Sequence, residues 1–220
     1  YNYAEKNKIV PEPLKNLYLG SDAKYTNDEL KIFEKYKITE FKNIEQILNL
    51  ILQNKIIATC RGRLEMGPRS LGNRSILADP RIVDNIEKIN RMIKNRDFWM
   101  PFAPVILHEK QELLINNPKN LESPHMTIAF ETIDGKKKFP AAVHQADGTA
   151  RPQILTKEVN PDIWELINGF FMKTGVPSLL NTSFNLHGEP IVNNIQDALH
   201  VFENSQLDAL WLNNHIIEKN

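Results

Sequence analysis

The 220-residue chain is 41% hydrophobic and 25% charged, and its 27 basic and 27 acidic side chains give a formal net charge of zero. This balance is typical of a globular domain and excludes a nucleic-acid binder driven by overall charge, although a local basic groove stays open. The single cysteine, Cys60, excludes an internal disulfide framework, and no apolar run is long enough to span a membrane, so we expect a cytoplasmic protein.

The first part of the chain contains an irregular segment followed by capped helices. Residues 1–25 lack periodicity, and we expect an arm or linker that packs only locally, followed by one domain over residues 26–220. Because the chain opens with Tyr, we also expect it to be a piece of a longer protein. Capping-box spacings at Thr26 and Asn43 predict helices over residues 28–37 and 44–53, and the apolar run Lys55–Cys60 predicts a buried strand.

Strands and helices roughly alternate over the rest of the chain. We expect helices over Asp84–Ile93, over Pro161 to Gly175 and over Ile195–Phe202, and strands over Phe102–Leu107, His125–Phe130, Val176–Leu180 and Leu207–Leu212. Lys136–Lys138 reads as a solvated hairpin turn, and Asp147-Gly148 as a turn into a strand that begins near Arg151. This order predicts an α/β or α+β fold whose sheet has mixed strand directions.

Arginine is concentrated in one stretch of the sequence. Seven of the eight arginines lie between Arg61 and Arg96, and the eighth is Arg151. Because guanidinium groups bind phosphate or carboxylate bidentately, this stretch predicts an anion site beside glycine-rich turns. The alternative is pairing with the nearby acids, which would still leave several arginines without a partner. Neither a Walker loop nor a dinucleotide fingerprint is present.

Four clusters are candidates for the chemistry, and each has an ordinary alternative. Arg69 and Arg74 would clamp phosphate or else be solvated, and Lys94 with Arg96 would bind one anion or else complement a helix dipole. Polar side chains over 181–185 follow a predicted strand and would bind a ligand or else stabilise a turn. The fourth cluster lies within eight residues and contains His144, Asp147, Thr149 and Arg151. It would act in acid–base chemistry or else be an ordinary loop. No His/Cys pair has zinc spacing, so we expect no structural metal site.

Several long motifs together carry a resemblance to a known family. They are GRLEMGPRSLGNRSILADPR, KNRDFWMPFAPVIL, HQADGTARPQ, TGVPSLLNTSFNLHGEPIV and LDALWL. The chain resembles the C-terminal domain of the nodulation- and antibiotic-type O-carbamoyltransferases over about Ile56 to Leu212. The resemblance implies a YrdC-like fold, similar to threonylcarbamoyl-adenylate synthases: a twisted, open, mixed α/β sheet with flanking helices and a concave nucleotide site. The Lys-x-Arg and Ser-x-Asn markers of that fold match Lys94-Asn95-Arg96 and Ser183-Phe184-Asn185.

The same resemblance implies the reaction and its participants. Such domains use carbamoyl phosphate and ATP, with Mg²⁺, to form carbamoyl-adenylate, which a separate N-terminal transferase domain of the same polypeptide then passes to a hydroxyl. Lys94 and Arg96 would bind an anionic phosphate, Arg69, Arg74 and Arg151 would complete the clamp, and His144 would lie near the carbamoyl group. The predicted nucleotide contacts are Thr149, Thr182, Ser183 and Asn185. Met100 stands where family members often carry an arginine.

Two alternatives to this activity stay open. One is a threonylcarbamoyl-adenylate synthase serving tRNA modification, although the long arginine-bearing segments favour the carbamoyltransferase. The other is a non-catalytic nucleotide- or RNA-binding module, which predicts aromatic side chains stacked around the arginines. Phe98, Trp99 and Phe102 are near in sequence, but their apolar segment is better explained as core.

Overall fold

A mixed β-sheet forms the centre of the molecule. The computed structural model describes residues 2–10, 14–94 and 100–219, without the side chains of Met92 and Lys94. Its main sheet has eight strands in the order β1-β10-β9-β2-β3-β8-β4-β7. Their bounds are β1 Lys37–Glu40, β2 Ile57–Thr59, β3 Ser75–Ala78, β4 Ala103–Leu107, β7 Gln153–Leu155, β8 Ser178–Ser183, β9 Ala209–Leu212 and β10 His215–Glu218. A separate antiparallel pair joins β5 (Phe130–Glu131) to β6 (Thr149–Ala150).

Strand direction decides which chain segments meet at one edge of the sheet. The pairs β2–β9 and β4–β7 are parallel, and the other neighbours are antiparallel. Ser183 at the end of β8 faces Ser75 at the start of β3, and Asn181 faces Ala103 at the start of β4. The end of β2, the start of β3, the end of β8 and the starts of β4 and β7 therefore share one edge.

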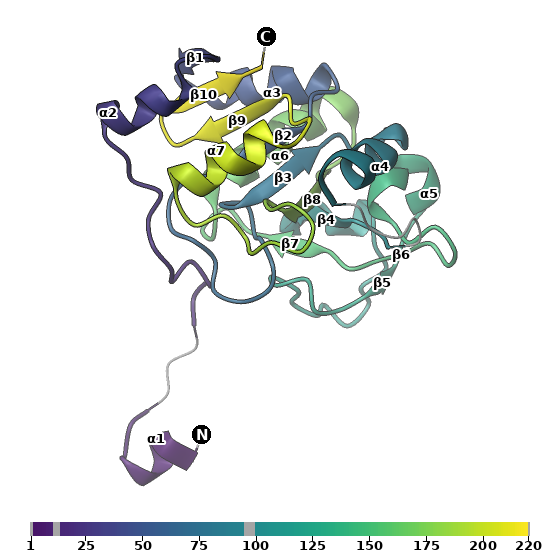
Figure 1. The fold of residues 1–220 in the computed structure, drawn as a ribbon. Coiled ribbons are helices and arrows are strands. Elements are labelled where there is room, and N and C mark those ends of the chain that lie inside the picture. The colour runs from purple at the N-terminus through teal and green to yellow at the C-terminus, as the bar shows by residue number, and fades with distance from the viewer. Residues whose placement is uncertain (1, 11–13, 95–99, 220) are drawn as a thin grey trace.

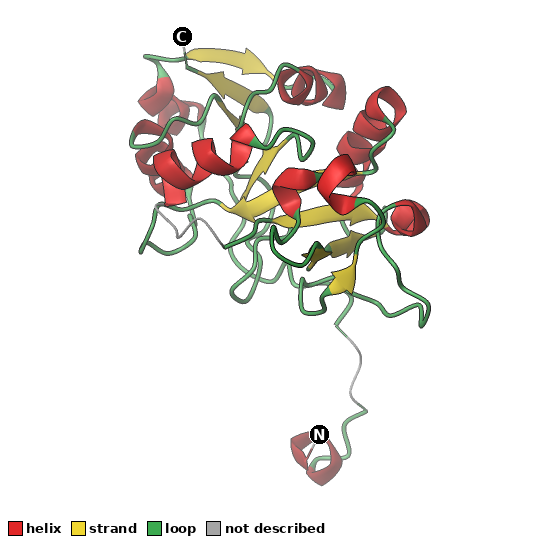
Figure 2. Ribbon diagram, turned by 90° about the vertical axis from the view of Figure 1, so that its right-hand side faces the viewer, coloured by secondary structure: helices red, strands yellow, loops and turns green. Residues whose placement is uncertain are grey.

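Helices cover both faces of this sheet. The α-helices are α1 Asn2–Lys6, α2 Asn27–Leu30, α3 Ile44–Leu52, α4 Asp84–Ile89, α5 Gly135–Lys138, α6 Pro161–Thr174 and α7 Ile195–Glu203. Helices α3 and α6 pack together behind the sheet, whereas α7 lies in front of it (Figure 1). Figure 2 shows the layers from the side. Short 3₁₀ helices span Lys31–Phe33, His108–Leu113 and Pro140–Ala142, and a π-helical turn over Asn90–Lys94 continues α4.

The core is built from the inward faces of these elements. The central strands β2, β3 and β9 are buried throughout, as continuous apolar runs require when helices cover both faces. Trp211 in β9 and Phe170 in α6 are completely buried. None of the helices in the described ranges is long and apolar enough to cross a membrane. The mixed sheet with flanking helices confirms the predicted fold class.

Local capping signals located most helices correctly. Asn160 caps α6, Pro161 follows at its first position, and Gly175 ends it at φ 76°. Asn194 caps α7 with the capping-box geometry. The helix predicted over residues 28–37 is much shorter, because α2 and one 3₁₀ turn end at Phe33 and the chain then enters β1.

Two other sequence predictions were wrong. Only Phe130 of the predicted strand His125–Phe130 is in a strand, because Met126 has a left-handed φ of 57°, which an extended strand cannot contain. Lys136–Lys138 belong to the helical turn α5 rather than to a hairpin turn. The sequence reading also missed β3 and β10, both of which are paired strands of the main sheet.

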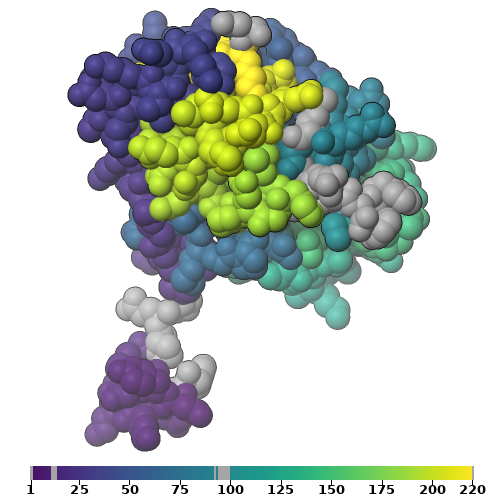
Figure 3. Space-filling view, viewed as in Figure 1, coloured from purple at the N-terminus to yellow at the C-terminus, as the bar shows by residue number. Residues whose placement is uncertain are grey.

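The N-terminal segment has two parts. Helix α1 has no buried residue and stands apart from the body, as the space-filling view makes plain (Figure 3). Residues 17–23 instead run beside residues 62–66: the Met66 amide donates to Leu17 O at 2.7 Å, and the Gly20 amide to Leu64 O at 2.9 Å. The expectation that the whole arm packs only locally is therefore wrong, while the division at residues 25 and 26 stays a prediction.

Candidate anion and nucleotide site

A large cavity lies at the edge of the sheet where β4 and β7 begin. Its volume is about 670 Å³, within the range of about 300–1,000 Å³ that is usual for small-molecule sites. Four predicted site residues line it: Arg69, His144, Thr149 and Arg151. They come from the β2–β3 loop, the turn before β6, β6 itself and the segment leading into β7. The fold therefore brings together side chains that are up to 82 positions apart in the chain (151 − 69).

A second, much smaller cavity adjoins the first. Its volume is about 60 Å³, and it shares Arg69, Arg151 and the segment 101–103 with the large cavity. The predicted residues Thr182 and Ser183 line it from the end of β8. Because the two arginines belong to both cavities, they stand at the junction between a large chamber and a small one.

Arg69 and Arg151 are the pair of cations at this junction. Both residues are exposed, and across the described ranges no carboxylate lies within ion-pair distance of either guanidinium. Burial and the positive charge of Arg69 together lower the pKa of Arg151. Two like charges held close together repel each other, and an anion bound between them would relieve that repulsion. The geometry therefore suits an anionic ligand.

Within the described ranges, the other arginines of the stretch contact groups of the protein itself. Arg81 pairs with Asp79 at 2.7 Å, and Arg91 pairs with Glu87. Arg63 donates to the carbonyl oxygens of Leu19 and Gly20 in the arm. Nearby acids are therefore the partners of only some of these arginines, and backbone carbonyl oxygens accept hydrogen bonds from the others.

Arg74 is completely buried and lines neither cavity. Its guanidinium donates to four backbone carbonyls, those of Arg61 at 2.8 Å, Asn73 at 3.0 Å, Asn193 at 3.2 Å and Gly62 at 3.3 Å. These bonds fasten the two ends of the β2–β3 loop to each other and to the start of α7. Its position supports a role in shaping the Arg69 loop rather than in contacting a phosphate.

A buried carboxylate holds the same loop from inside. Glu65 is 5% exposed, and its Oε1 accepts the amides of Leu71 at 2.7 Å, Asn73 at 2.8 Å and Arg74 at 3.3 Å. At Gly72, φ is +118°, and an added Cβ would lie 2.9 Å from Ile163 Cγ1. The loop therefore needs both the glutamate and the glycine at these positions.

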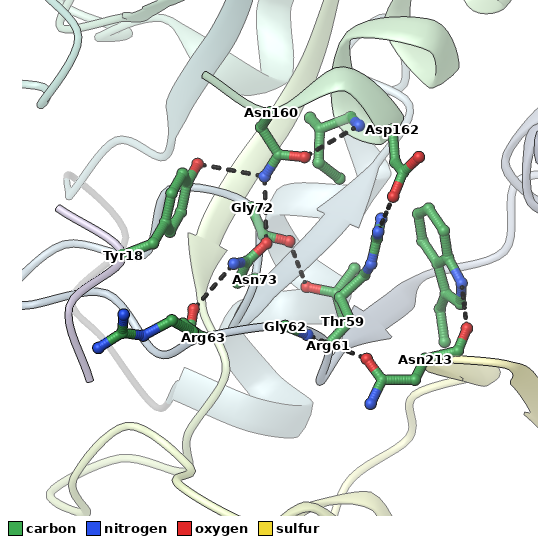
Figure 4. Close-up of polar contacts among 12 residues, drawn as sticks. Tyr18, Thr59, Arg61, Gly62, Arg63, Gly72, Asn73, Asn160, Asp162 and Asn213 are labelled. Carbon is green, nitrogen blue, oxygen red and sulfur yellow. Dashed lines mark hydrogen bonds and ion pairs between the residues drawn. The ribbon is translucent and has the colours of Figure 1, made fainter. Parts of the chain in front are cut away.

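A polar network connects the loop to the arm and to α6 (Figure 4). Asn160 donates to Tyr18 Oη and to Asn73 Oδ1, each at 3.1 Å, and Tyr18 donates to Leu71 O at 2.8 Å. Burial raises the pKa of Tyr18, so its hydroxyl stays protonated as a donor. These contacts fix the backbone on the C-terminal side of Arg69.

Arg61 lies in the same polar network and lines neither cavity. It forms an ion pair with Asp162, and its Cζ lies 3.9 Å from the centroid of the Trp211 ring. Burial lowers the pKa of Arg61, and the carboxylate of Asp162 acts in the opposite direction. This stacked and paired arginine connects the end of β2 to the start of α6.

His144 and Thr149 are held by a tight turn. The His144 amide donates to Thr149 O at 2.8 Å, and His144 Nδ1 lies 3.2 Å from Asp147 Oδ1. Asp147 Oδ1 accepts both the amide and the hydroxyl of Thr149 at 2.8 Å, and these bonds lower the pKa of Asp147. Asp147 thus orients a histidine that lines the large cavity.

The predicted markers are only partly within the described residues. Lys94 is the last residue of the π-helical turn, but its side chain and Arg96 lie outside the described part. Ser183 lines the small cavity, and its Oγ donates to Asn185 Oδ1 at 2.6 Å. The sequence reading assigned no role to His187 or Ser70, which also line the cavities.

Within the described ranges, no group of three His, Cys, Asp or Glu side chains lies close enough to hold a metal ion.

Comparison with known protein families gives a match over most of the chain. Residues 48–219 match the family described as "Carbamoyltransferase C-terminus". Over 216 residues the chain is 42% identical to an uncharacterized protein of Methanocaldococcus jannaschii, covering 94% of this chain and 41% of the relative. It is 42% identical over 170 residues to the nodulation protein NolNO of Sinorhizobium fredii, covering 77% of this chain and 25% of that protein.

A cephem carbamoyltransferase and a solved structure are also similar. The chain is 33% identical over 149 residues to the 3'-hydroxymethylcephem-O-carbamoyltransferase of Streptomyces clavuligerus, covering 68% of this chain and 28% of that enzyme. The crystal structure of full-length HypF in its phosphate- and nucleotide-bound form has a TM-score of 0.55 at 16% identity, covering 82% of this chain and 26% of HypF. At that identity the likeness concerns the fold. The chain thus spans between a quarter and two-fifths of the length of these curated relatives.

Proposed function

Because the chain belongs to the carbamoyltransferase C-terminus family, we propose that it is the carbamoyl-activating domain of an O-carbamoyltransferase. Its substrates are carbamoyl phosphate and ATP, and its product is carbamoyl-adenylate. The similar enzyme of Streptomyces clavuligerus is a 3'-hydroxymethylcephem-O-carbamoyltransferase, and activation of the carbamoyl group is the step that suits two adjoining cavities with cations between them.

The proposed reaction has two balanced steps. Water first cleaves carbamoyl phosphate to carbamate and inorganic phosphate. A carbamate oxygen then attacks the α-phosphorus of ATP, the bond to the β-phosphate breaks, and pyrophosphate leaves. Both steps develop negative charge on phosphoryl oxygens, and fixed cations in a cleft stabilise such charge more strongly than water does.

The observation that carries this proposal is the unpaired arginine pair at the junction of the cavities. Arg69 and Arg151 have no carboxylate partner in the described part of the chain, and burial together with Arg69 lowers the pKa of Arg151. A phosphate shared between them would accept bidentate hydrogen bonds from both planar guanidinium groups. The phosphate group of carbamoyl phosphate, which leaves as inorganic phosphate in the first step, is the anion that fits this position.

The other residues have supporting roles in the proposal. His144, oriented by Asp147, faces the large cavity as a donor to a phosphoryl or carbamoyl oxygen, and Thr149 supports the same turn. Thr182 and Ser183 line the small cavity at the end of β8 and would contact the nucleotide where its α-phosphate reaches the junction, and Ser183 Oγ donates to Asn185 Oδ1. Lys94 and Arg96 are proposed as further phosphate ligands on the sequence marker alone, and Arg74 positions the loop.

ATP would occupy the large cavity in this proposal. A volume of about 670 Å³ accommodates a nucleotide, whereas the adjoining 60 Å³ does not. The fold likeness to HypF, whose structure is described as phosphate- and nucleotide-bound, supports this assignment. Mg²⁺ bound to ATP would neutralise part of the phosphate charge.

A further domain would complete the transfer. The relatives are longer than this chain, which covers 41% of the archaeal relative and 28% of the cephem carbamoyltransferase. We propose that an N-terminal transferase domain of the same polypeptide receives carbamoyl-adenylate and delivers the carbamoyl group to its hydroxyl acceptor.

Exchange of labelled pyrophosphate into ATP tests the proposal directly. We expect exchange on the purified chain that depends on carbamoyl phosphate and falls by at least about 100-fold in Arg69→Met, the loss typical of removing one transition-state donor. Lys119→Met, which removes one exposed lysine, is the charge-matched control and should exchange normally. Exchange that requires threonine and bicarbonate instead would establish the alternative activity, that of a threonylcarbamoyl-adenylate synthase. ATP binding with no exchange under any of these conditions would refute independent activation by this chain.

A further inference from the structure

Two residues that line the small cavity carry a donor and an acceptor with no hydrogen-bond partner in the described part of the chain. Ser70 is 3% exposed and Asn181 is 2% exposed, and both line the 60 Å³ cavity. Within the described part of the chain, neither Ser70 Oγ nor Asn181 Oδ1 makes a hydrogen bond. Buried polar atoms are nearly always satisfied in folded proteins, so two unsatisfied atoms at one cavity point to a missing ligand.

The orientation of the Asn181 amide is fixed by its neighbours. Asn181 Nδ2 donates to Ser70 O at 3.1 Å and to Gln153 Oε1 at 3.3 Å. Gln153 is oriented in turn, because its Nε2 donates to Leu71 O at 3.1 Å. Flipping the Asn181 amide would set its oxygen against two acceptor oxygens. The free group of Asn181 is therefore an acceptor, and it requires a ligand that carries an N–H or O–H donor.

Ser70 supplies the complementary function. Its hydroxyl can donate to a carbonyl oxygen, and its own carbonyl already holds Asn181 in place. A ligand group that satisfies both residues carries one acceptor and one donor a short distance apart. A planar primary amide has this arrangement, since its C=O accepts and its NH₂ donates.

We propose that the small cavity is the carbamoyl pocket, in which Asn181 Oδ1 accepts from the carbamoyl NH₂ and Ser70 Oγ donates to its C=O. The inference rests on the proposed function, because it assigns the anion between Arg69 and Arg151 to the phosphate of the same ligand. A cavity of about 60 Å³ has room for about two water molecules at about 30 Å³ each, and so for the three non-hydrogen atoms of a carbamoyl group.

This arrangement makes Asn181 a specificity-determining residue. An acyl phosphate with a methyl group in place of NH₂ has no donor for Asn181 Oδ1 and leaves that oxygen buried and unpaired. A carboxylate in the same place would set oxygen against oxygen. Sites built to bond an N–H or O–H reject analogues that lack it, because their own polar groups stay unsatisfied. The pocket therefore selects carbamoyl phosphate over acetyl phosphate.

Two stable phosphonates of the same shape test the pocket by isothermal titration calorimetry on the 220-residue chain. Phosphonoacetamide carries the amide NH₂, and 2-oxopropylphosphonate carries a methyl group in its place. We expect wild-type protein to bind phosphonoacetamide about tenfold more tightly, which corresponds to about 1.4 kcal/mol. Inorganic phosphate, which reaches only the arginines, is the reference ligand. Equal affinity for the two phosphonates would overturn the inference.

Variants separate the two hydrogen bonds. Ser70→Ala should weaken both phosphonates by about fivefold and leave inorganic phosphate unchanged, since both phosphonates carry the carbonyl. Its hydroxyl makes no hydrogen bond within the described structure, so the fold should persist. Asn181→Ala should abolish the preference between the phosphonates. Ser178→Ala, a buried serine at the other end of β8, is the control and should bind as wild type.

The outcomes distinguish this inference from the proposed function. Wild-type protein that binds no phosphate would remove the anion site and with it the basis of both. Phosphate binding without amide preference, or a Ser70→Ala variant that loses phosphate as well, would refute the carbamoyl pocket alone. A clear amide preference without ATP–pyrophosphate exchange would support the pocket and contradict the adenylation step.

Discussion

Replacing Glu65 tests whether one buried carboxylate shapes the loop that carries Arg69. Its Oε1 accepts three backbone amides at 2.7, 2.8 and 3.3 Å from a position that is 5% exposed. Glu65→Ala leaves three buried N–H groups without an acceptor, and each unmet group costs about 1 kcal/mol or more. We expect the free energy of unfolding to fall by about 3 kcal/mol, which lowers the melting temperature by about 6–12 °C for a protein of this size.

Urea unfolding monitored by circular dichroism measures this change, with Glu112→Ala as the control. Glu112 is exposed, and its replacement should alter the free energy of unfolding by less than about 0.5 kcal/mol. Glu65→Gln keeps an acceptor oxygen and should lose about half as much stability as Glu65→Ala. If Glu65→Ala is no less stable than the Glu112→Ala control, the carboxylate does not hold the loop and the reasoning is wrong.

Three further predictions concern the loop, the arm and the histidine turn. Gly72→Ala should lower the free energy of unfolding in urea titrations by about 3 kcal/mol, because its Cβ would lie 2.9 Å from Ile163 Cγ1. Gly67→Ala, whose Cβ would have nothing within 4 Å, should lower it by only about 1 kcal/mol through backbone strain. Equal losses in the two variants would contradict the steric argument. Tyr18→Phe should lower the free energy of unfolding by about 1–2 kcal/mol, because it removes the hydrogen bonds to Leu71 and Asn160. Tyr3 is exposed, so Tyr3→Phe is the control and should leave the melting temperature unchanged. Similar melting temperatures for the two variants would show that these bonds of the arm do not stabilise the fold. The pKa of Asp147 is lowered in the folded protein, so its contribution to stability is present above the ordinary carboxyl pKa of 3.8 and is lost as the pH falls below that pKa. The difference in melting temperature between wild type and Asp147→Asn should therefore disappear in acid. A difference that does not change with pH would refute this role of Asp147.

Much of the fold could be predicted because its signals are local. The Asn-Pro start and glycine end of α6, and the capping asparagine of α7, act within one helical turn and were visible in the sequence. Strand β1 pairs with β10 from the opposite end of the chain, so no local pattern reveals β1. Strand β10 follows β9 through the two-residue turn Asn213-Asn214, a local hairpin that the sequence analysis did not predict. Met126 likewise sits in an apolar segment that resembles a strand, yet its left-handed backbone prevents one.

The candidate site was predicted in part. Arg69, His144, Thr149 and Arg151 were candidates from residue type, and the structure brings them around one cavity. Arg74 looked equivalent to Arg69 in the sequence, but it is buried among backbone carbonyls. Ser70 was not predicted, because only the structure shows that its hydroxyl is buried beside Asn181 and makes no hydrogen bond to any described residue.

The sequence by itself determined the kinds of element and the chemistry available to the site. Helix caps, apolar runs and the concentration of arginine are properties of neighbouring residues, and they do not depend on the rest of the fold. Only the tertiary structure decided which arginines of the described ranges have partners within the protein. Arg61 pairs with Asp162, which is 101 positions away, and Arg74 pairs with carbonyls from separate segments, so neither partner was visible in the sequence. The order and direction of the strands set Arg69 beside Arg151, because long-range pairing fixes which loops meet at one edge of the sheet.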